Sequence, residues 1–424
     1  MEKDMTHQLM IVLNLGGTAA FEVARRIREC GVYCEVLPHT VTKEELMAKE
    51  AQGIVLTGGF EDVAEERAKK VPWLADCGLP VLEVGRGTSL SVEALSGGVG
   101  KNCLNVFLKT SCDCVGDWSL SIFLEETVAS LRERIGSGRV LLGLSGGVDS
   151  SVTAALLSRA VGKQLVCIFI DNGFMRQDEG DEVEAAFQGW DMTFLRINAE
   201  TKFLFKLLGM TEPQRKRQII SDEQLHLIGQ ISDKMGGVQL LARGTTYTDL
   251  LTGHFVPTVH PLTEPGEGPQ MLEPIRCLFK QEVRALALEL GLPEYLAWRQ
   301  PFPGAGLAVR CVGCITKERL DIVRHADAIF RQELGSRGLD RQLSQAFAII
   351  TEVKTSGVRG DRRTNEYTVA LRAVTGEDSS SAEWADLPCE LLRAVSRRIT
   401  TEVKGVNRVV YDITSTPPAT IEWE

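Results

Sequence analysis

Residues 142–151 read LGLSGGVDSS, and this stretch decides how the middle of the chain folds. The apolar run RVLLGLS leads into the two glycines, and SSVTAALLSRAVG then reads as a helix. A strand, a glycine turn and a helix in that order present backbone N–H groups and the positive end of the helix dipole to an anion. The stretch therefore predicts a phosphate-binding turn, and the alternative is an ordinary glycine turn with serine caps.

The rest of the chain divides by pattern into three predicted domains, residues 1–117, 118–310 and 311–424. Apolar runs ending in glycine recur in the first, as LMIVLNLGG, QGIVLTGGF and LPVLEVGRG, before a linker at 109–117. Further buried runs, QLVCIFIDNG and VQLLARGTT, follow in the second. Strands that alternate with helices indicate parallel α/β sheets, whereas the third segment mixes strands and helices as an α+β domain. We expect an α/β protein overall.

Bulk composition excludes several classes of protein. The chain has 424 residues, a net charge of −10, 44% hydrophobic and 25% charged residues, which is typical of a soluble globular protein. The negative charge argues against non-specific nucleic-acid binding. No apolar stretch is long enough to span a bilayer, and the N-terminus does not read as a signal peptide, so we expect a cytoplasmic protein without a membrane partner. Eleven cysteines without framework spacing indicate reduced thiols.

Three further motifs narrow the interpretation: IDNGFMR at 170–176, PFPGAGLAVR at 301–310 and RVVYDITSTPPATIEWE at 408–424. SGGVDSS resembles the pyrophosphate loop of the N-type ATP pyrophosphatases, and the motifs together resemble the GMP synthase family over essentially the whole chain. The resemblance implies a class I amidotransferase-like domain, a Rossmann-like ATP pyrophosphatase domain and a C-terminal domain that forms a homodimer. It implies a C–N ligase that adenylates xanthosine monophosphate (XMP) with ATP and Mg²⁺, and then aminates it to GMP.

The resemblance also assigns roles to individual residues. Asp149, Asp249 and Lys280 would be catalytic, and Asp149 would also hold Mg²⁺. The acceptor nucleotide would be bound by Arg217, Arg310, Gln345, Arg408, Ile421 and Glu422. ATP would be bound by Ser145, Gly146, Gly147, Val148, Asp149, Ser150, Ser151 and Asp171.

The amidotransferase segment departs from the family pattern. Where the family has a cysteine in a strained turn (GVCYGMQ-like), this chain has EVGRGTS, with Gly85 at the cysteine position. Glycine carries no nucleophile, so no glutamyl thioester can form. Cys77 and Cys103 do not lie in the turn, and no HPE-like motif precedes residue 142. We expect a shortened, non-catalytic remnant, and ammonia that comes from solution or from a separate glutaminase.

The synthetase segment departs on the acceptor side. Thr252 stands where the family has a glutamate, and Thr416 stands where it has a lysine expected to hold the nucleotide phosphate. The lid region, 254–271, keeps His254 and His260 without the family's paired histidines, and Gln300 replaces a histidine. Loss of one charge-assisted phosphate contact costs about 1.5–3 kcal/mol. Two alternatives therefore remain: a paralogue that adenylates another, non-phosphorylated purine-like acceptor, and a non-catalytic nucleotide-binding homologue.

The pair Cys311 and Cys314 has the C-x-x-C spacing of a zinc or redox site. One such pair supplies only two of the four ligands that zinc needs, and no second C-x-x-C exists in the sequence. The C-x-C pair Cys112 and Cys114 has the wrong spacing. We therefore expect no metal at these cysteines.

Overall fold

The computed structural model describes residues 7–17, 19–58, 63–88, 90–95, 97–252, 270–376 and 381–424. Two compact units are present. The first comprises residues 1–130 with 251–253, and the second comprises residues 131–250 with 254–424. Each is described by itself.

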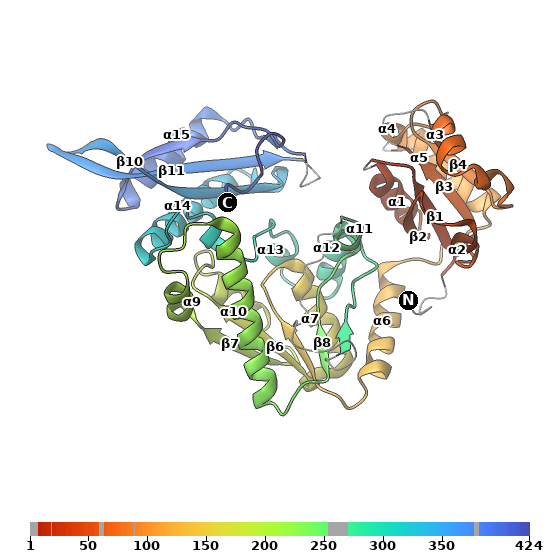
Figure 1. The fold of residues 1–424 in the computed structure, drawn as a ribbon, viewed down its shortest axis with the longest axis horizontal. Coiled ribbons are helices and arrows are strands. Elements are labelled where there is room, and N and C mark those ends of the chain that lie inside the picture. The colour runs from red at the N-terminus through yellow and green to blue at the C-terminus, as the bar shows by residue number, and fades with distance from the viewer. Residues whose placement is uncertain are drawn as a thin grey trace. The chain divides into compact units, whose positions relative to one another are not determined.

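The first unit contains a parallel four-stranded sheet in the order β2-β1-β3-β4 (Figure 1). Its core is built by apolar runs such as LMIVLN, whose central residues Met10, Ile11 and Val12 are fully buried. The elements are β1 (Leu9–Asn14), α1 (Ala19–Glu29), β2 (Tyr33–Pro38), α2 (Lys43–Met47), β3 (Gly53–Thr57), α3 (Val63–Lys70), η1 (Pro72–Asp76), β4 (Val81–Val84), α4 (Val92–Leu95), α5 (Gly98–Val106) and η2 (Phe107–Ser111). Helix α6 (Leu120–Ile135) leads into the second unit.

The second unit begins with a parallel five-stranded sheet in the order β7-β6-β5-β8-β9. The chain runs from β5 to β7 on one side and then returns to place β8 on the other side of β5, so ligands are expected beyond the carboxyl end of β5. The elements are β5 (Val140–Gly143), α7 (Val148–Val161), η3 (Gly162–Gln164), β6 (Leu165–Asp171), α8 (Glu179–Ala186), β7 (Thr193–Asn198), α9 (Glu200–Lys206), α10 (Pro213–Lys234), β8 (Leu240–Ala242), α11 (Tyr247–Thr252), β9 (Gln270–Leu272), α12 (Lys280–Glu289), α13 (Glu294–Ala297) and η4 (Gly306–Val309).

A second sheet follows in the same unit. Strand β11 pairs antiparallel with β10 and β12 and parallel with β13, which gives the expected α+β arrangement. The elements are α14 (Lys317–Gly335), η5 (Asp340–Gln342), β10 (Gln345–Arg359), β11 (Arg362–Thr375), β12 (Glu383–Trp384), α15 (Cys389–Glu402) and β13 (Val406–Tyr411).

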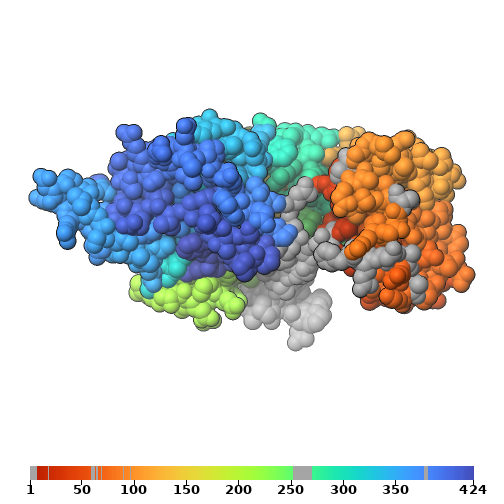
Figure 2. Space-filling model, turned by 90° about the horizontal axis from the view of Figure 1, so that it is seen from above, coloured from red at the N-terminus to blue at the C-terminus, as the bar shows by residue number. Residues whose placement is uncertain are grey.

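One hydrophobic core joins the two sheets of the second unit. It includes Ile168 and Phe203 from the parallel part and Ile350 and Val395 from the C-terminal part. In the space-filling view the blue surface of the C-terminal part lies against the green segment of the parallel part (Figure 2). The α/β fold class is confirmed, whereas the domain boundaries at 117 and 310 stay predictions.

Most expected elements are present with small shifts. The expected linker at 109–117 overlaps the end of the helical turn η2, and α6 follows the linker. Among the described residues, no helix is long and apolar enough to cross a membrane. Residues 254–269 of the lid region, with His254 and His260, lie outside the described residues, and Gln270 and Met271 begin β9.

Candidate active site

The glycine turn follows β5 directly and leads into α7. Gly146 adopts a left-handed conformation with φ of 79°, which glycine tolerates at no steric cost. Gly147 is the extended N-cap of α7, and it provides no side-chain cap. The first N–H groups of a helix have no carbonyl one turn earlier to bind, so those of Val148 and Asp149 remain available to an anion.

Serine hydroxyls brace this turn from within. The Ser145 and Ser150 hydroxyl oxygens are 2.9 Å apart, and Ser150 also donates to the Gly147 carbonyl at 3.1 Å. The Ser145 hydroxyl accepts from the Gly147 N–H at 3.3 Å. Ser151 is fully buried, and its hydroxyl has no hydrogen-bond partner among the residues that the structure describes. The serines therefore shape the turn and take up the N–H groups of Ser145 and Gly147, and the N–H groups of Val148 and Asp149 at the start of α7 are left for a ligand.

Asp149 and Lys280 form an ion pair beside the turn. The Lys280 ammonium, at the start of α12, lies 2.7 Å and 2.5 Å from the two carboxylate oxygens of Asp149. Gly244, which follows β8, lies so close to this helix start that an added Cβ would meet the Asp149 backbone at 2.8 Å. Two segments far apart in the sequence, at Gly244 and at Lys280, therefore converge on the turn.

A cavity of about 510 Å³ opens at the carboxyl ends of β5, β6 and β8. One part of its lining is polar, formed by the turn with Lys280 and Arg299, and another part is apolar, with Ile168 and Ile170 from β6 among its members. A volume of this size accommodates a small ligand, and the mixture of apolar walls with a few placed polar groups is typical of nucleotide-sized sites.

The predicted nucleotide residues divide into two groups. Ser145, Gly147, Val148, Asp149 and Lys280 line this cavity, whereas Gly146 in the same turn and Ser150 and Ser151 in α7 are not among its lining residues.

Two predicted residues point elsewhere. Asp171 lines a second, smaller cavity of about 240 Å³, where it binds Arg196 at 3.0 Å. Its neighbour Ile170 lines the first cavity because successive side chains of a strand point to opposite faces. Asp249 accepts hydrogen bonds from the Thr246 N–H and hydroxyl at 2.8 Å and 2.7 Å, and so caps the start of α11. The side chain of Thr252 lies outside the described residues.

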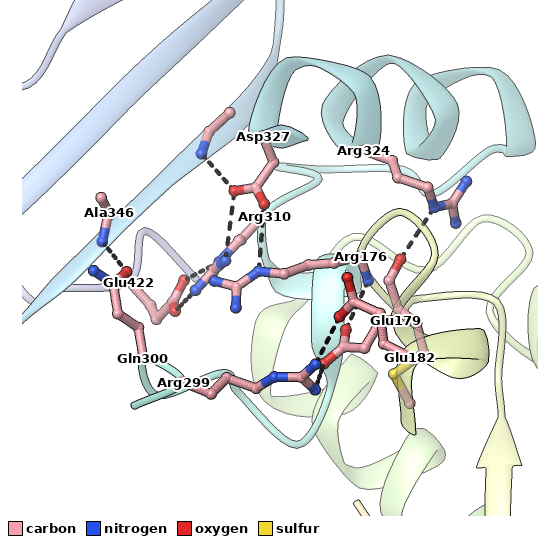
Figure 3. A network of polar contacts seen from close by, with 12 residues as sticks. Arg176, Glu179, Glu182, Arg299, Gln300, Arg310, Arg324, Asp327, Ala346 and Glu422 are labelled. Atoms are coloured by element: carbon pink, nitrogen blue, oxygen red, sulfur yellow. Dashed lines mark hydrogen bonds and ion pairs between the residues drawn. The ribbon is translucent and has the colours of Figure 1, made fainter. Parts of the chain in front are cut away.

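None of the predicted acceptor residues is among the residues that line the 510 Å³ cavity, although the Arg310 guanidinium lies 5.1 Å from the ring centroid of Phe302, which does line it. Arg310 is fully buried, and its guanidinium donates to Glu422 at 2.8 Å and lies 3.9 Å from Asp327 (Figure 3). The guanidinium also lies over the Phe347 ring, 3.9 Å from its centroid. Arg217 is exposed and donates to the Glu424 carbonyl. Arg310 and Glu422 are thus each other's partners in this structure.

The other three acceptor candidates lie on or beside the C-terminal sheet. Gln345 begins β10, and Ile421 packs on the face of that sheet with Phe347 and Ile349. Arg408 is exposed on β13 and donates to the Thr355 hydroxyl at 3.2 Å. All acceptor roles stay predictions.

Thr416, at the position of the family's lysine, is held by a buried arginine. The fully buried Arg372 donates to the Thr416 hydroxyl at 3.2 Å and to Asp412 at 2.7 Å. Hydrogen bonds from Trp423 and Thr414 and the charge of Arg372 outweigh burial and hold the pKa of Asp412 below its ordinary value. Arg372 was not foreseen from the sequence, since an isolated arginine in a strand gives no signal of its partners.

The turn after β4 is the expected site of the missing nucleophile. Gly85 has φ of 141°, and an added Cβ would meet Val63 Cγ2 at 2.9 Å. The Gly85 N–H donates to the Leu90 carbonyl, and the Thr88 hydroxyl binds both Gly85 and Leu90. The N–H group and the carbonyl of Gly85 are therefore both bonded within this turn.

The cysteine pairs show no sign of a metal site. Burial raises the pKa of the Cys311 thiol to about 11, and those of Cys112 and Cys114 to about 12 and about 11. Zinc binds the thiolate, which these surroundings disfavour. Within the described ranges, no group of three or more His, Cys, Asp or Glu side chains is arranged to hold a metal ion.

Comparisons with known proteins agree with this architecture. Three family models match: glutamine amidotransferase class-I over residues 11–127, NAD synthase over 120–323 and the GMP synthase C terminal domain over 332–423. Among solved structures, NMN synthetase from Francisella tularensis has a TM-score of 0.38 and 15% identity over 48% of this chain and 85% of that one, a likeness too weak to assign a fold or a function.

Curated relatives match along the whole chain. The GMP synthase [glutamine-hydrolyzing] of Acetivibrio thermocellus is 39% identical over 511 residues, covering 99% of this chain and all of the relative. That of Ruminiclostridium cellulolyticum is 38% identical over the same span. Because 511 aligned residues exceed the 424 of this chain, the relatives contain segments that it lacks. The chain belongs to the GMP synthase family.

Proposed function

We propose that this chain aminates XMP to GMP with ATP, through an adenylated intermediate, and that it takes ammonia from outside its own N-terminal unit. The observation that carries the proposal is the glycine turn at the mouth of the 510 Å³ cavity, with the Asp149–Lys280 pair beside it. Its outward N–H groups, the α7 N-terminus and one ammonium group suit a triphosphate.

The chemistry follows from that arrangement in two steps. The C2 carbonyl oxygen of the XMP base attacks the α-phosphorus of ATP, a new O–P bond forms, and pyrophosphate leaves. Ammonia then adds at C2, the C–O bond to AMP breaks, and the nitrogen loses a proton. The turn N–H groups and Lys280 would stabilise the charge that builds on the leaving pyrophosphate, where preorganised donors have their largest effect.

The residues present fit a magnesium ion. Mg²⁺ is usually held by one or two carboxylates together with substrate phosphates, and Asp149 offers such a carboxylate at the turn. Bound there, the ion would neutralise phosphate charge. The Lys280 ammonium contacts both carboxylate oxygens of Asp149. With Mg²⁺ bound, the ammonium and the metal ion would therefore share this carboxylate and the phosphates.

The first unit is the reason to propose an external source of ammonia. Gly85 offers no nucleophile, and the N–H group of Gly85 is already bonded to Thr88 and Leu90. The chain is shorter than its family members, and a trimmed amidotransferase unit would account for that difference. We further propose a homodimer formed through the C-terminal part.

A different acceptor is the second candidate, favoured by Thr416. The position where a lysine would meet the nucleotide phosphate instead presents a hydroxyl already bound to Arg372. An acceptor without a phosphate, such as a nucleoside or base, would need no cation there.

The test is product formation by the purified full-length chain with ATP, Mg²⁺, XMP and ammonium chloride. GMP and pyrophosphate in equal amounts are expected. Absence of GMP at high ammonium contradicts the XMP proposal, and pyrophosphate release with xanthosine or xanthine instead supports the second candidate.

A further inference from the structure

Two adjacent residues on the loop after α13 reach in opposite directions across the second unit. Arg299 contacts the phosphate-binding turn, and Gln300 contacts the start of β10. We infer that these two residues, the Arg299–Gln300 strap, position the turn relative to the acceptor-side segment, so that the reacting groups meet in register. The inference rests on the proposed function for its substrates.

Arg299 fixes the turn from its cavity side. One guanidinium nitrogen donates to the Gly146 carbonyl at 3.0 Å and to Glu179 at 2.8 Å, and the other donates to Glu182 at 2.9 Å. Its side chain is 7% exposed, and that of Glu179 is 3% exposed. Charge-assisted hydrogen bonds in such a buried place are strong and geometrically specific. Gly146 is also the residue with φ of 79°, so Arg299 holds the turn at the point of its left-handed bend.

Gln300 fixes the acceptor-side segment at the start of β10. Its amide oxygen accepts from the Ala346 N–H at 2.9 Å, and its amide nitrogen donates to the carbonyls of Asp340 and Leu343 at 3.0 Å and 3.4 Å. An amide supplies one acceptor and two donors, whereas the neutral histidine expected at this position supplies one of each. Gln300 thus secures β10 beside Gln345, the predicted acceptor ligand.

A second set of contacts runs in parallel between the same two regions (Figure 3). Glu179 accepts from the Arg176 N–H at 2.9 Å, and the Arg176 side chain lies 3.3 Å from Asp327. Asp327 in turn accepts from Ala348 on β10 at 3.2 Å and lies near Arg310. Burial lowers the pKa of Arg176 to about 10 despite the opposing charge of Asp327.

These contacts explain why the strap has a positioning role. The hydrogen bonds of both side chains end on protein groups, so neither residue depends on substrate for its partners. Gly146 O and Ala346 N belong to backbone at the two sites, and residues 299 and 300 are covalent neighbours. A shift of the turn relative to β10 must therefore break a hydrogen bond at one end or the other.

The test compares Gln300→Leu with Gln342→Leu. Gln342 is exposed, and within the described part of the chain its side chain binds the Gly338 carbonyl at 3.3 Å, so its substitution controls for the loss of a surface amide. For Gln300→Leu we expect kcat for GMP formation to fall about tenfold, because three hydrogen bonds of modest net strength are lost. The KM for ATP should stay within about twofold, since the turn itself keeps Arg299.

Arg299→Lys tests the other end against Arg341→Lys. Arg341 is exposed and pairs with Glu294 at 2.7 Å. Lysine keeps the positive charge beside Glu179 but has one nitrogen in place of the two guanidinium nitrogens that bind Gly146, Glu179 and Glu182. Arg299→Lys should therefore raise the KM for ATP and lower kcat. Arg341→Lys should change neither. Gln300→His should recover part of the rate lost in Gln300→Leu, because histidine retains one donor and one acceptor.

Hydrogen exchange of the free protein separates this inference from the proposed function, since it needs no acceptor. Faster exchange at residues 340–346 in Gln300→Leu and at 145–150 in Arg299→Lys, with unchanged melting temperatures, supports the strap even if XMP is not the substrate. Unchanged exchange and unchanged kcat in both variants, or equal losses in the Gln342 and Arg341 controls, overturn it.

Discussion

The turn after β4 and the turn after β5 occupy equivalent places, each at the carboxyl end of a strand in a parallel sheet. In the turn after β4, Thr88 and Leu90 take up the N–H group of Gly85, and Val63 occupies the space that a Cβ at Gly85 would need. In the turn after β5, the serines brace the backbone while the first N–H groups of α7 point outward. Glycine alone therefore does not make an anion site; the available donors and the neighbouring charges do.

The same contrast extends to the groups nearby. Lys280 and Arg299 bring positive charge to the turn after β5, and Asp149 offers a carboxylate. At the turn after β4, Gly85 lacks the nucleophilic side chain that a glutaminase requires. The turn after β5 thus offers donors and charges to a ligand, whereas in the turn after β4 the polar groups of Gly85 are bonded to Thr88 and Leu90.

The largest effect is expected from Asp149→Asn. Loss of the carboxylate removes the partner of Lys280 and the proposed ligand for Mg²⁺, so kcat for pyrophosphate release should fall about 10²–10³-fold. Steady-state rates with saturating ATP and Mg²⁺ measure it. Asp233→Asn, at an exposed aspartate of α10, is the matched control and should leave the rate unchanged. A rate near that of the unmodified chain would remove Asp149 from the mechanism.

Gly244→Ala should lower the rate about tenfold. The new Cβ would press on the Asp149 carbonyl carbon and oxygen at 2.8 Å and 2.9 Å, and overpacking of this kind costs about 1–3 kcal/mol. Gly229→Ala on α10 is the control, because no described atom lies within 4 Å of its added Cβ and alanine favours a helix. If both variants keep full activity, the close approach of β8 to the turn is not important.

Gly85→Cys should destabilise the chain by about 1–3 kcal/mol without creating a glutaminase. The new side chain would meet Val63 in a backbone conformation that favours glycine, and a thiol alone has no base to activate it. Thermal unfolding and glutamate release from glutamine are the two readouts. Glutamine hydrolysis above background by this variant would show that the rest of the triad survives.

Much of this contrast can be predicted from the amino-acid sequence alone. The strand, turn and helix around residues 142–151 follow from the hydrophobic pattern and the two glycines. The missing nucleophile is visible in the sequence as a glycine, Gly85, at the position of the family's cysteine. Successive side chains of β6 point to opposite faces of the sheet, and the motif IDNG alone does not indicate which face Asp171 is on. The partners of Arg310 and Arg299 could not be foreseen, since Glu422 and Gly146 are more than one hundred residues distant and meet them only through tertiary packing.

The smallest effect is expected from acid pH on the C-terminal segment that contains Trp423. Since the pKa of Asp412 lies below its ordinary value, its contacts contribute stability above about pH 4 and lose it as the pH falls through the lower folded-state value. Trp423 donates to Asp412 at 2.9 Å, so its fluorescence should change in that acid range. Asp412→Asn should abolish this acid transition, and a transition that persists in the variant would assign it to another group.

The most direct test of the central claim compares two nitrogen sources in one assay. The purified chain is given ATP, Mg²⁺ and XMP with either ammonium chloride or glutamine, and GMP is measured over time. We predict steady GMP formation with ammonium and none above background with glutamine. GMP formation from glutamine at the ammonium rate would contradict the account, because it would show that the first unit still delivers ammonia.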